Sequence, residues 1–117
     1  MPDEQPVGIA VLAESTVLVP TLFWFEFRNL LVVSERRARV SPAQTATILA
    51  EVARLPLEVD DQPQEHRVIG LARRHRLTVY DATYLELAER RGGRLATLDR
   101  RLAAAAADEG IAVAAPA

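Results

Sequence analysis

The chain has 117 residues, a formal net charge of −2 and 50% hydrophobic residues, which is typical of one globular domain. It contains no cysteine, which excludes disulfides, thiolate metal sites and cysteine nucleophiles. The net charge does not indicate a nucleic-acid binder, and no apolar run approaches the roughly 20 residues of a membrane span. The acidic first residues lack the basic segment of a secretory signal, so we expect a soluble, cytoplasmic protein.

Hydrophobic periodicity and turn residues predict the elements of the first half of the chain. They are a short helix at 3–13, a strand at 17–19, a helix from 21 to about 37, a helix from 42 to about 54 and a strand at 57–59. Ser41 is followed by Pro42 and, three positions on, by Gln44. This spacing is typical of a capping box, in which the side chains of a helix's first turn bind its free backbone N–H groups.

The second half continues the alternation of helices and strands. It predicts a polar loop at 60–63, a helix at 64–76, an extended segment at 77–80, a helix at 81–91, a strand at 95–98, a helix from 99 to about 109 and a strand at 111–113. Strands that alternate with helices predict a parallel sheet covered by helices on both faces. No linker or repeat divides the chain, so we expect a single domain over 1–117.

Three carboxylates follow the predicted strands, in the crevice where open parallel sheets place their chemistry. Asp99 comes directly after the strand at 95–98, Asp81 opens a helix, and Glu26 lies two turns into the helix that follows the strand at 17–19. Taken singly, the two aspartates are ordinary helix caps and Glu26 is a polar-face residue. Taken together, they indicate a site for Mg²⁺ or Mn²⁺, which prefer carboxylate and water oxygens and can activate water at a phosphodiester.

Three stretches of the sequence carry a family resemblance. Residues 19–31 hold Glu26 and, three positions later, Asn29; residues 77–88 hold a Y-D-A-x-Y core with Asp81; residues 95–102 read T-x-D-x-x-L, with Thr97 and Asp99. In order and spacing, these stretches resemble the last three motifs of the PIN-domain ribonuclease family, of the VapC toxin type.

The resemblance implies a PIN-like three-layer α/β/α fold with a parallel central sheet. It also implies a Mg²⁺- or Mn²⁺-dependent endoribonuclease in which Glu26, Asp81 and Asp99 are the catalytic metal ligands, supported by Asn29 and Thr97. The implied partners are an RNA substrate, a cognate VapB-type antitoxin and a second copy of the chain in a homodimer.

The sequence departs from the family pattern before Val17. The family begins with a strand that ends in the first metal-binding aspartate, and nothing at 1–16 resembles that segment. Asp3 is a poor substitute because no strand precedes it. We therefore expect an N-terminally shortened domain without the first strand and one of four acids, through either a start codon assigned too late or a truly shortened product.

Two functions from different classes follow from this departure. The first is the metal-dependent ribonuclease toxin, and the second is a degenerate, non-catalytic PIN domain that binds antitoxin or RNA. A generic nucleotide binder is disfavoured because no glycine-rich strand-to-helix turn is present. The basic stretches 73–76 and 90–91 are read as solvated helix ends, or alternatively as phosphate contacts.

Overall fold

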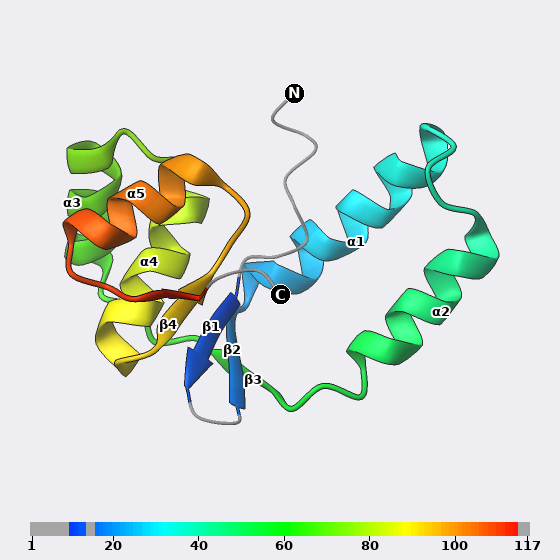
Figure 1. Cartoon of the computed structure of the whole chain (residues 1–117), viewed down its shortest axis with the longest axis horizontal. Coiled ribbons are helices and arrows are strands. Elements are labelled where there is room, and N and C mark those ends of the chain that lie inside the picture. The colour runs from blue at the N-terminus through cyan, green and yellow to red at the C-terminus, as the bar shows by residue number, and fades with distance from the viewer. Residues whose placement is uncertain (1–9, 14–15, 115–117) are drawn as a thin grey trace.

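The computed structural model describes residues 10–13 and 16–114, which form a five-stranded sheet with five helices (Figure 1). The strands are β1 (Ala10–Ala13), β2 (Thr16–Pro20), β3 (Leu57–Asp60), β4 (Arg94–Ala96) and β5 (Val113–Ala114). The helices are α1 (Leu22–Arg36), α2 (Pro42–Val52), α3 (Glu65–His75), α4 (Val79–Arg91) and α5 (Arg100–Asp108). The predicted α/β class is confirmed. No helix in the described residues is long and apolar enough to cross a bilayer.

The sheet has the strand order β3-β2-β1-β4-β5 and is mixed, not fully parallel as the sequence predicted. The pairs β2–β3 and β4–β5 are parallel, whereas β1 runs antiparallel to both β2 and β4. Because both neighbours of β1 oppose it, the other four strands all point the same way. Their carboxyl ends therefore still share one edge of the sheet, as the sequence argument requires.

The conformation and position of β1 contradict two predictions made from the sequence. Residues 10–13 form a strand and not the end of a helix, while 1–9 lie outside the described residues, as does Asp3. The strand also fills the central position that was expected to be empty. Its Val11 is fully buried against the core, and the turn after α4 comes so close that a Cβ on Gly93 would lie 2.6 Å from Val11 Cγ1. Burial of this short apolar run between two strands overrides its local helix pattern.

Helix α4 is the centre of the hydrophobic core. It packs against α3 and against β1, β2 and β4, and six of its residues are buried. The core side chains around it include Leu71 from α3, Leu95 from β4 and Leu102 from α5. The helix begins at Val79, two residues earlier than predicted, because Thr78 and not Asp81 is its cap: the Thr78 hydroxyl accepts a hydrogen bond from the Asp81 backbone N–H at 3.1 Å.

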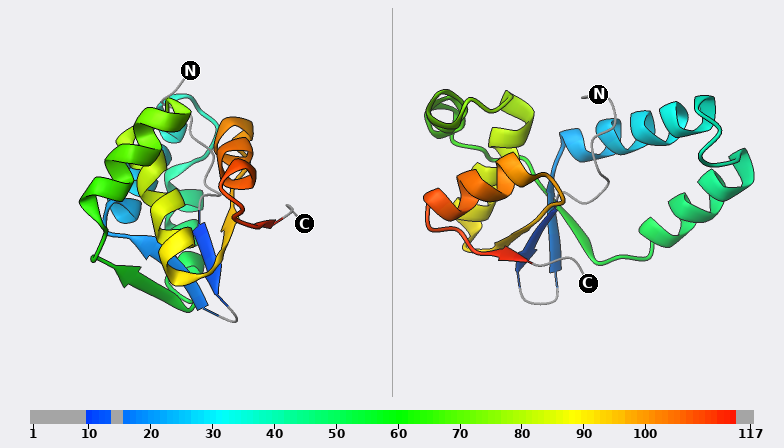
Figure 2. Two further views of the ribbon diagram at one scale, coloured as in Figure 1. Left: turned by 90° about the vertical axis from the view of Figure 1, so that its left-hand side faces the viewer. Right: turned by 45° about the horizontal axis from the view of Figure 1, so that its top comes forward.

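Helices α1 and α2 form an arm that extends away from the sheet (Figures 1 and 2). The prediction that helices cover both faces of the sheet therefore does not describe this pair. None of the residues of α2 is buried. The predicted capping box is confirmed, with Ser41 Oγ accepting from the Gln44 N–H at 3.1 Å and Gln44 Oε1 accepting from the Ser41 N–H at 2.8 Å. At the base of the arm, Phe27 is buried and stacks on Phe23 with ring centroids 5.5 Å apart.

The end of β3 is tied to the end of α4 by a buried ion-pair network. Asp60 belongs to β3 and is buried, although the sequence predicted a solvated loop there. Its carboxylate accepts hydrogen bonds from Arg90 at 2.8 and 2.9 Å and from Arg91 at 2.7 Å. These bonds, the one from Arg90 first, hold the pKa of Asp60 well below its usual value despite burial. Arg90 also binds Glu86, whose side chain is 1% exposed.

We expect Asp60→Asn to lower the free energy of unfolding by about 3 kcal/mol at pH 7, because it removes the buried charge that Arg90 and Arg91 share and leaves each with one carboxylate partner, Glu86 and Glu58. Since the pKa of Asp60 is depressed in the folded state, the stabilisation is complete above the unfolded pKa, near 4, and declines as the pH falls below it. Urea unfolding at pH 7 and pH 3 measures both effects. Asp61→Asn, at the exposed neighbouring position, is the control and should remain close to the parent; an equal loss in both variants would contradict the prediction.

Candidate functional site

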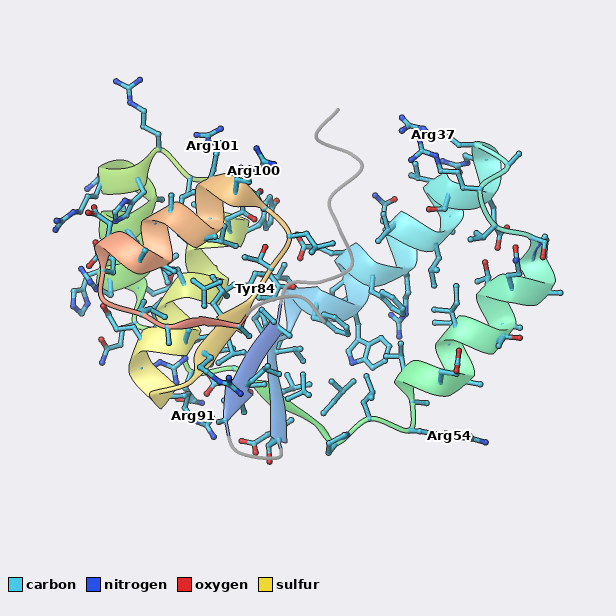
Figure 3. All side chains as sticks on the ribbon, in the orientation of Figure 1. Arg37, Arg54, Tyr84, Arg91, Arg100 and Arg101 are labelled. Carbon is cyan, nitrogen blue, oxygen red and sulfur yellow. The ribbon has the colours of Figure 1, made fainter. Side chains whose placement is uncertain are left out.

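Two of the three predicted metal ligands lie in segments that follow strands pointing the same way, and the third lies at the start of α4. Glu26 lies on α1 after β2, Asp99 follows β4, and Asp81 lies in the first turn of α4. Because β2 and β4 point the same way, Glu26 and Asp99 leave the sheet at the same edge. Figure 3 shows Tyr84, one turn beyond Asp81, in the middle of the molecule between α4 and the base of α1.

Glu26 is half-buried and turned toward α4. Its Oε1 accepts a hydrogen bond from the hydroxyl of Tyr84 at 2.9 Å. Burial raises the pKa of Glu26, the negative charge of Asp81 raises it further, and the Tyr84 hydrogen bond partly opposes both. Tyr84 itself is 2% exposed, and its pKa is raised by burial and by the charges of Glu26 and Asp81.

Asp81 interacts electrostatically with both of the other acids, since its charge raises the pKa of Glu26 and the charge of Asp99 raises its own pKa. Burial raises the pKa of Asp81 and so does the negative charge of Asp99, while the positive charge of Arg101 and the Thr78 hydroxyl act in the opposite direction. Asp81 is therefore the common neighbour that links Glu26 to Asp99 electrostatically. No salt bridge joins Glu26 or Asp81 to a basic side chain among the described residues.

Asp99 is the predicted cap of α5. Its Oδ1 accepts from the backbone N–H groups of Arg101 at 2.9 Å and Leu102 at 3.3 Å, and its own N–H donates to the Thr97 hydroxyl at 3.0 Å. Thr97 is buried, so it fixes the backbone that carries Asp99. Asn29 is exposed, and no hydrogen bond joins it to Glu26 in the part of the chain that the structure describes. Its supporting role stays a prediction.

Glu26 and Asp81 differ from other carboxylates of the molecule in the direction in which their pKa values are shifted. Hydrogen bonds from arginine or histidine lower the pKa of Asp60, Glu89 and Glu109. Glu26 and Asp81 have raised pKa values instead, because burial and like charges act on them without an ion-pair partner. Half-buried carboxylates whose repulsion is uncompensated are typical of functional sites and of sites that bind a cation.

The donor chemistry fits Mg²⁺ or Mn²⁺, since the acids supply carboxylate oxygens, the charge of Asp81 raises the pKa of Glu26, and the charge of Asp99 raises that of Asp81. Within the described residues, however, no group of three His, Cys, Asp or Glu side chains is arranged closely enough to enclose a metal ion. Glu26 is turned toward Tyr84, and Asp99 Oδ1 is committed to the α5 backbone. An ion at these acids would therefore be held through one or two carboxylates with waters between, as Mg²⁺ commonly is.

Several of the basic residues singled out in the sequence form ion pairs within the protein. Arg90 and Arg91 are paired with Asp60, and Arg74 with Glu109, so these side chains are already engaged within the protein. The sequence reasoning missed Arg101, which lies next to Asp81 and donates to the backbone carbonyl of Arg76 at 2.9 Å. It also missed the contact of Tyr84 with Glu26, although Tyr84 is the second tyrosine of the Y-D-A-x-Y core.

Comparison with known proteins identifies the fold family. The model of the PIN domain family matches residues 5–108. A stretch of 34 residues is 64% identical to part of Ribonuclease VapC3 of Pyrobaculum aerophilum. This stretch makes up 29% of this chain and 26% of that protein. The match thus spans about a quarter of the length of that curated relative. The family match covers the three motifs and most of the described fold, and the chain belongs to the PIN domain family.

Proposed function

We propose that the chain is a Mg²⁺- or Mn²⁺-dependent endoribonuclease, the toxin component of a VapBC-type toxin–antitoxin system. The single observation that carries the proposal is the pair of half-buried acids, Glu26 and Asp81. Burial and like charge raise the pKa values of both, neither forms a salt bridge among the described residues, and Arg101 offsets only part of the effect at Asp81. They lie in the stretches whose sequence resembles acidic motifs of the PIN domain family, and the short match to a protein named as a ribonuclease supports the same activity.

In this proposal Glu26, Asp81 and Asp99 hold the ion, directly or through water. When bound, the ion supplies Lewis-acid activation of the attacking water and neutralises charge on the phosphodiester. The protein contributes orientation: the Tyr84 hydroxyl fixes the direction of the Glu26 carboxylate, and Thr97 fixes the backbone of Asp99. Arg101 limits the net negative charge that an approaching phosphate would meet.

The partners follow from the same family relationship. We propose a cognate VapB-type antitoxin, an RNA substrate, a homodimer and a cytoplasmic location. The arm of α1 and α2 supports a protein–protein contact, because it extends away from the sheet and exposes Val32. Exposed apolar side chains on a projecting arm are typical of surfaces that bind another chain.

A second candidate function is a non-catalytic PIN domain that binds antitoxin or RNA. It is favoured by one observation, the lack of a closed three-ligand metal group in the described residues. The two candidates differ in one measurable property, which is whether a divalent ion binds at Glu26, Asp81 and Asp99. The next three predictions test that property in different ways.

We expect the purified chain to cleave total RNA in the presence of Mg²⁺ or Mn²⁺ and to lose at least 100-fold of this activity in Asp99→Asn or Glu26→Gln. These substitutions remove charge and keep shape: asparagine also caps a helix, and glutamine still accepts the Tyr84 hydrogen bond. Gel analysis of labelled RNA measures cleavage. Asp61→Asn, an exposed acid outside the site, should retain full activity. Cleavage that persists in Asp99→Asn or in excess EDTA would rule out the proposed mechanism.

We expect Glu26→Gln to raise the melting temperature of the metal-free chain at pH 7, since it removes one of two repelling, half-buried charges. The pKa of Glu26 is raised in the folded state, so its charge destabilises the fold above the unfolded pKa, near 4.3, and the advantage of the variant should shrink at lower pH. Millimolar Mg²⁺ should then raise the melting temperature of the parent more than that of the variant. Equal responses of the two chains to Mg²⁺ would favour the non-catalytic candidate.

We expect Tyr84→Phe to weaken Mn²⁺ binding and RNA cleavage by about 10- to 100-fold, because the Glu26 carboxylate loses the donor that orients it. The ring remains in the core, so the secondary structure by circular dichroism should be unchanged. Titration calorimetry with Mn²⁺ alone separates this effect from catalysis. Tyr80→Phe removes a hydroxyl from an exposed tyrosine of the same helix and should leave Mn²⁺ affinity unchanged; equal affinities of Tyr84→Phe and the parent would exclude the positioning role.

A further inference from the structure

The three most exposed large hydrophobic side chains in the described residues share one position in the sequence. They are Phe25 at 70%, Tyr80 at 61% and Leu98 at 59% exposure, followed by Leu55 at 49%. Each of the first three immediately precedes one of the acids of the candidate site. The site is therefore bordered, along three separate segments of the chain, by apolar groups that the fold leaves in solvent.

Local geometry explains why these side chains stand beside the acids. Successive residues of a helix project about 100° apart, so Phe25 on α1 and Tyr80 on α4 lie on the helix faces adjacent to those of Glu26 and Asp81. Leu98 lies between β4 and the cap of α5. Tyr80 makes no ring contact and no side-chain hydrogen bond with any residue that the structure describes, so its ring is free to contact a ligand.

Positive charge lies next to this apolar border. Arg100 and Arg101 directly follow Asp99, and Figure 3 shows both at the start of α5. Arg100 is exposed, and no salt bridge or hydrogen bond engages its side chain in the described part of the protein. Exposed apolar side chains and an exposed arginine are thus both adjacent in sequence to the acids of the candidate site.

We propose that Tyr80 and Phe25, with Leu98, contact unpaired nucleobases of an RNA strand at the candidate site, while Arg100 contacts its phosphates. The inference rests on the proposed ribonuclease function and adds the residues that select the substrate. A single strand alternates planar apolar bases with charged phosphates, and aromatic side chains bind such strands by stacking on the bases. Tyr80 is a positioning residue in this scheme, because its ring binds a base beside the scissile phosphate and takes no part in the reaction.

The experiment compares Tyr80→Ala, Tyr80→Phe and the parent in two backgrounds. In the Asp99→Asn background, binding of an unstructured oligoribonucleotide carrying 2-aminopurine is followed by fluorescence, which stacking quenches. In the active background, kcat and KM are measured on the same RNA with Mg²⁺. We expect Tyr80→Ala to weaken binding and raise KM roughly tenfold with little change in kcat, and Tyr80→Phe to restore both. Leu55→Ala, at an exposed position away from the acids, is the matched control.

The outcomes separate this inference from the function on which it rests. If the parent cleaves RNA and Tyr80→Ala has unchanged binding and KM, the base contact is wrong and the ribonuclease stands. If Tyr80→Ala and Tyr80→Phe are equally impaired, stacking is not the cause and the inference fails. If the parent binds RNA through Tyr80 without cleaving it, the base contact stands and catalysis does not. If Tyr80→Ala changes only the binding of a protein partner, or the chain binds no RNA, the inference is overturned.

Discussion

Burial of the Glu26 and Asp81 carboxylates, together with their like charges, is the constraint on which the candidate site depends. If the segments that carry them were flexible, Glu26 and Asp81 would move apart or become solvated, because like charges repel. They stay close because Asp81 belongs to α4, whose buried residues Ala82, Tyr84 and Leu85 pack into the core. Hydrophobic burial along one helix thus offsets an unfavourable electrostatic contact at its first turn. A fold that maintains such repulsion is typical of a site at which stability has been exchanged for function.

The charged residues at the two ends of α4 lie in opposite electrostatic environments. Asp81 at the start and Arg90 and Arg91 at the end all suit the helix dipole. At the end, Asp60 lies within 2.9 Å of both arginines, so the charges cancel inside the protein. At the start, Asp81 faces other acids, and Arg101 offsets only part of their effect. At the first turn, therefore, the like charges are only partly offset within the described residues.

Sequence periodicity predicted the helices and most strands because each has an apolar face that can be read locally. The capping box at Ser41 and the cap at Asp99 were predictable for the same reason, since their partners lie two or three residues away. The sequence did not predict β1, because four apolar residues suit a strand or a buried helix equally well. Nor did it predict the partners of Asp60 or the Tyr84–Glu26 bond, which join residues 30 or more positions apart.

The reversed direction of β1 determines which segments can supply acids to the site. Its first residue, Ala10, pairs with Ala96, next to the Thr97–Asp99 segment, so the beginning of β1 and not its end lies at the site edge. Its described residues are all apolar and contribute no carboxylate there. The described acids of the site therefore come from α1, α4 and the β4–α5 connection alone. In the proposed function these three acids would hold Mg²⁺ largely through water, since Mg²⁺ tolerates few protein ligands when water completes its shell. The affinity for that ion, more than the fold, distinguishes a nuclease from a binding domain.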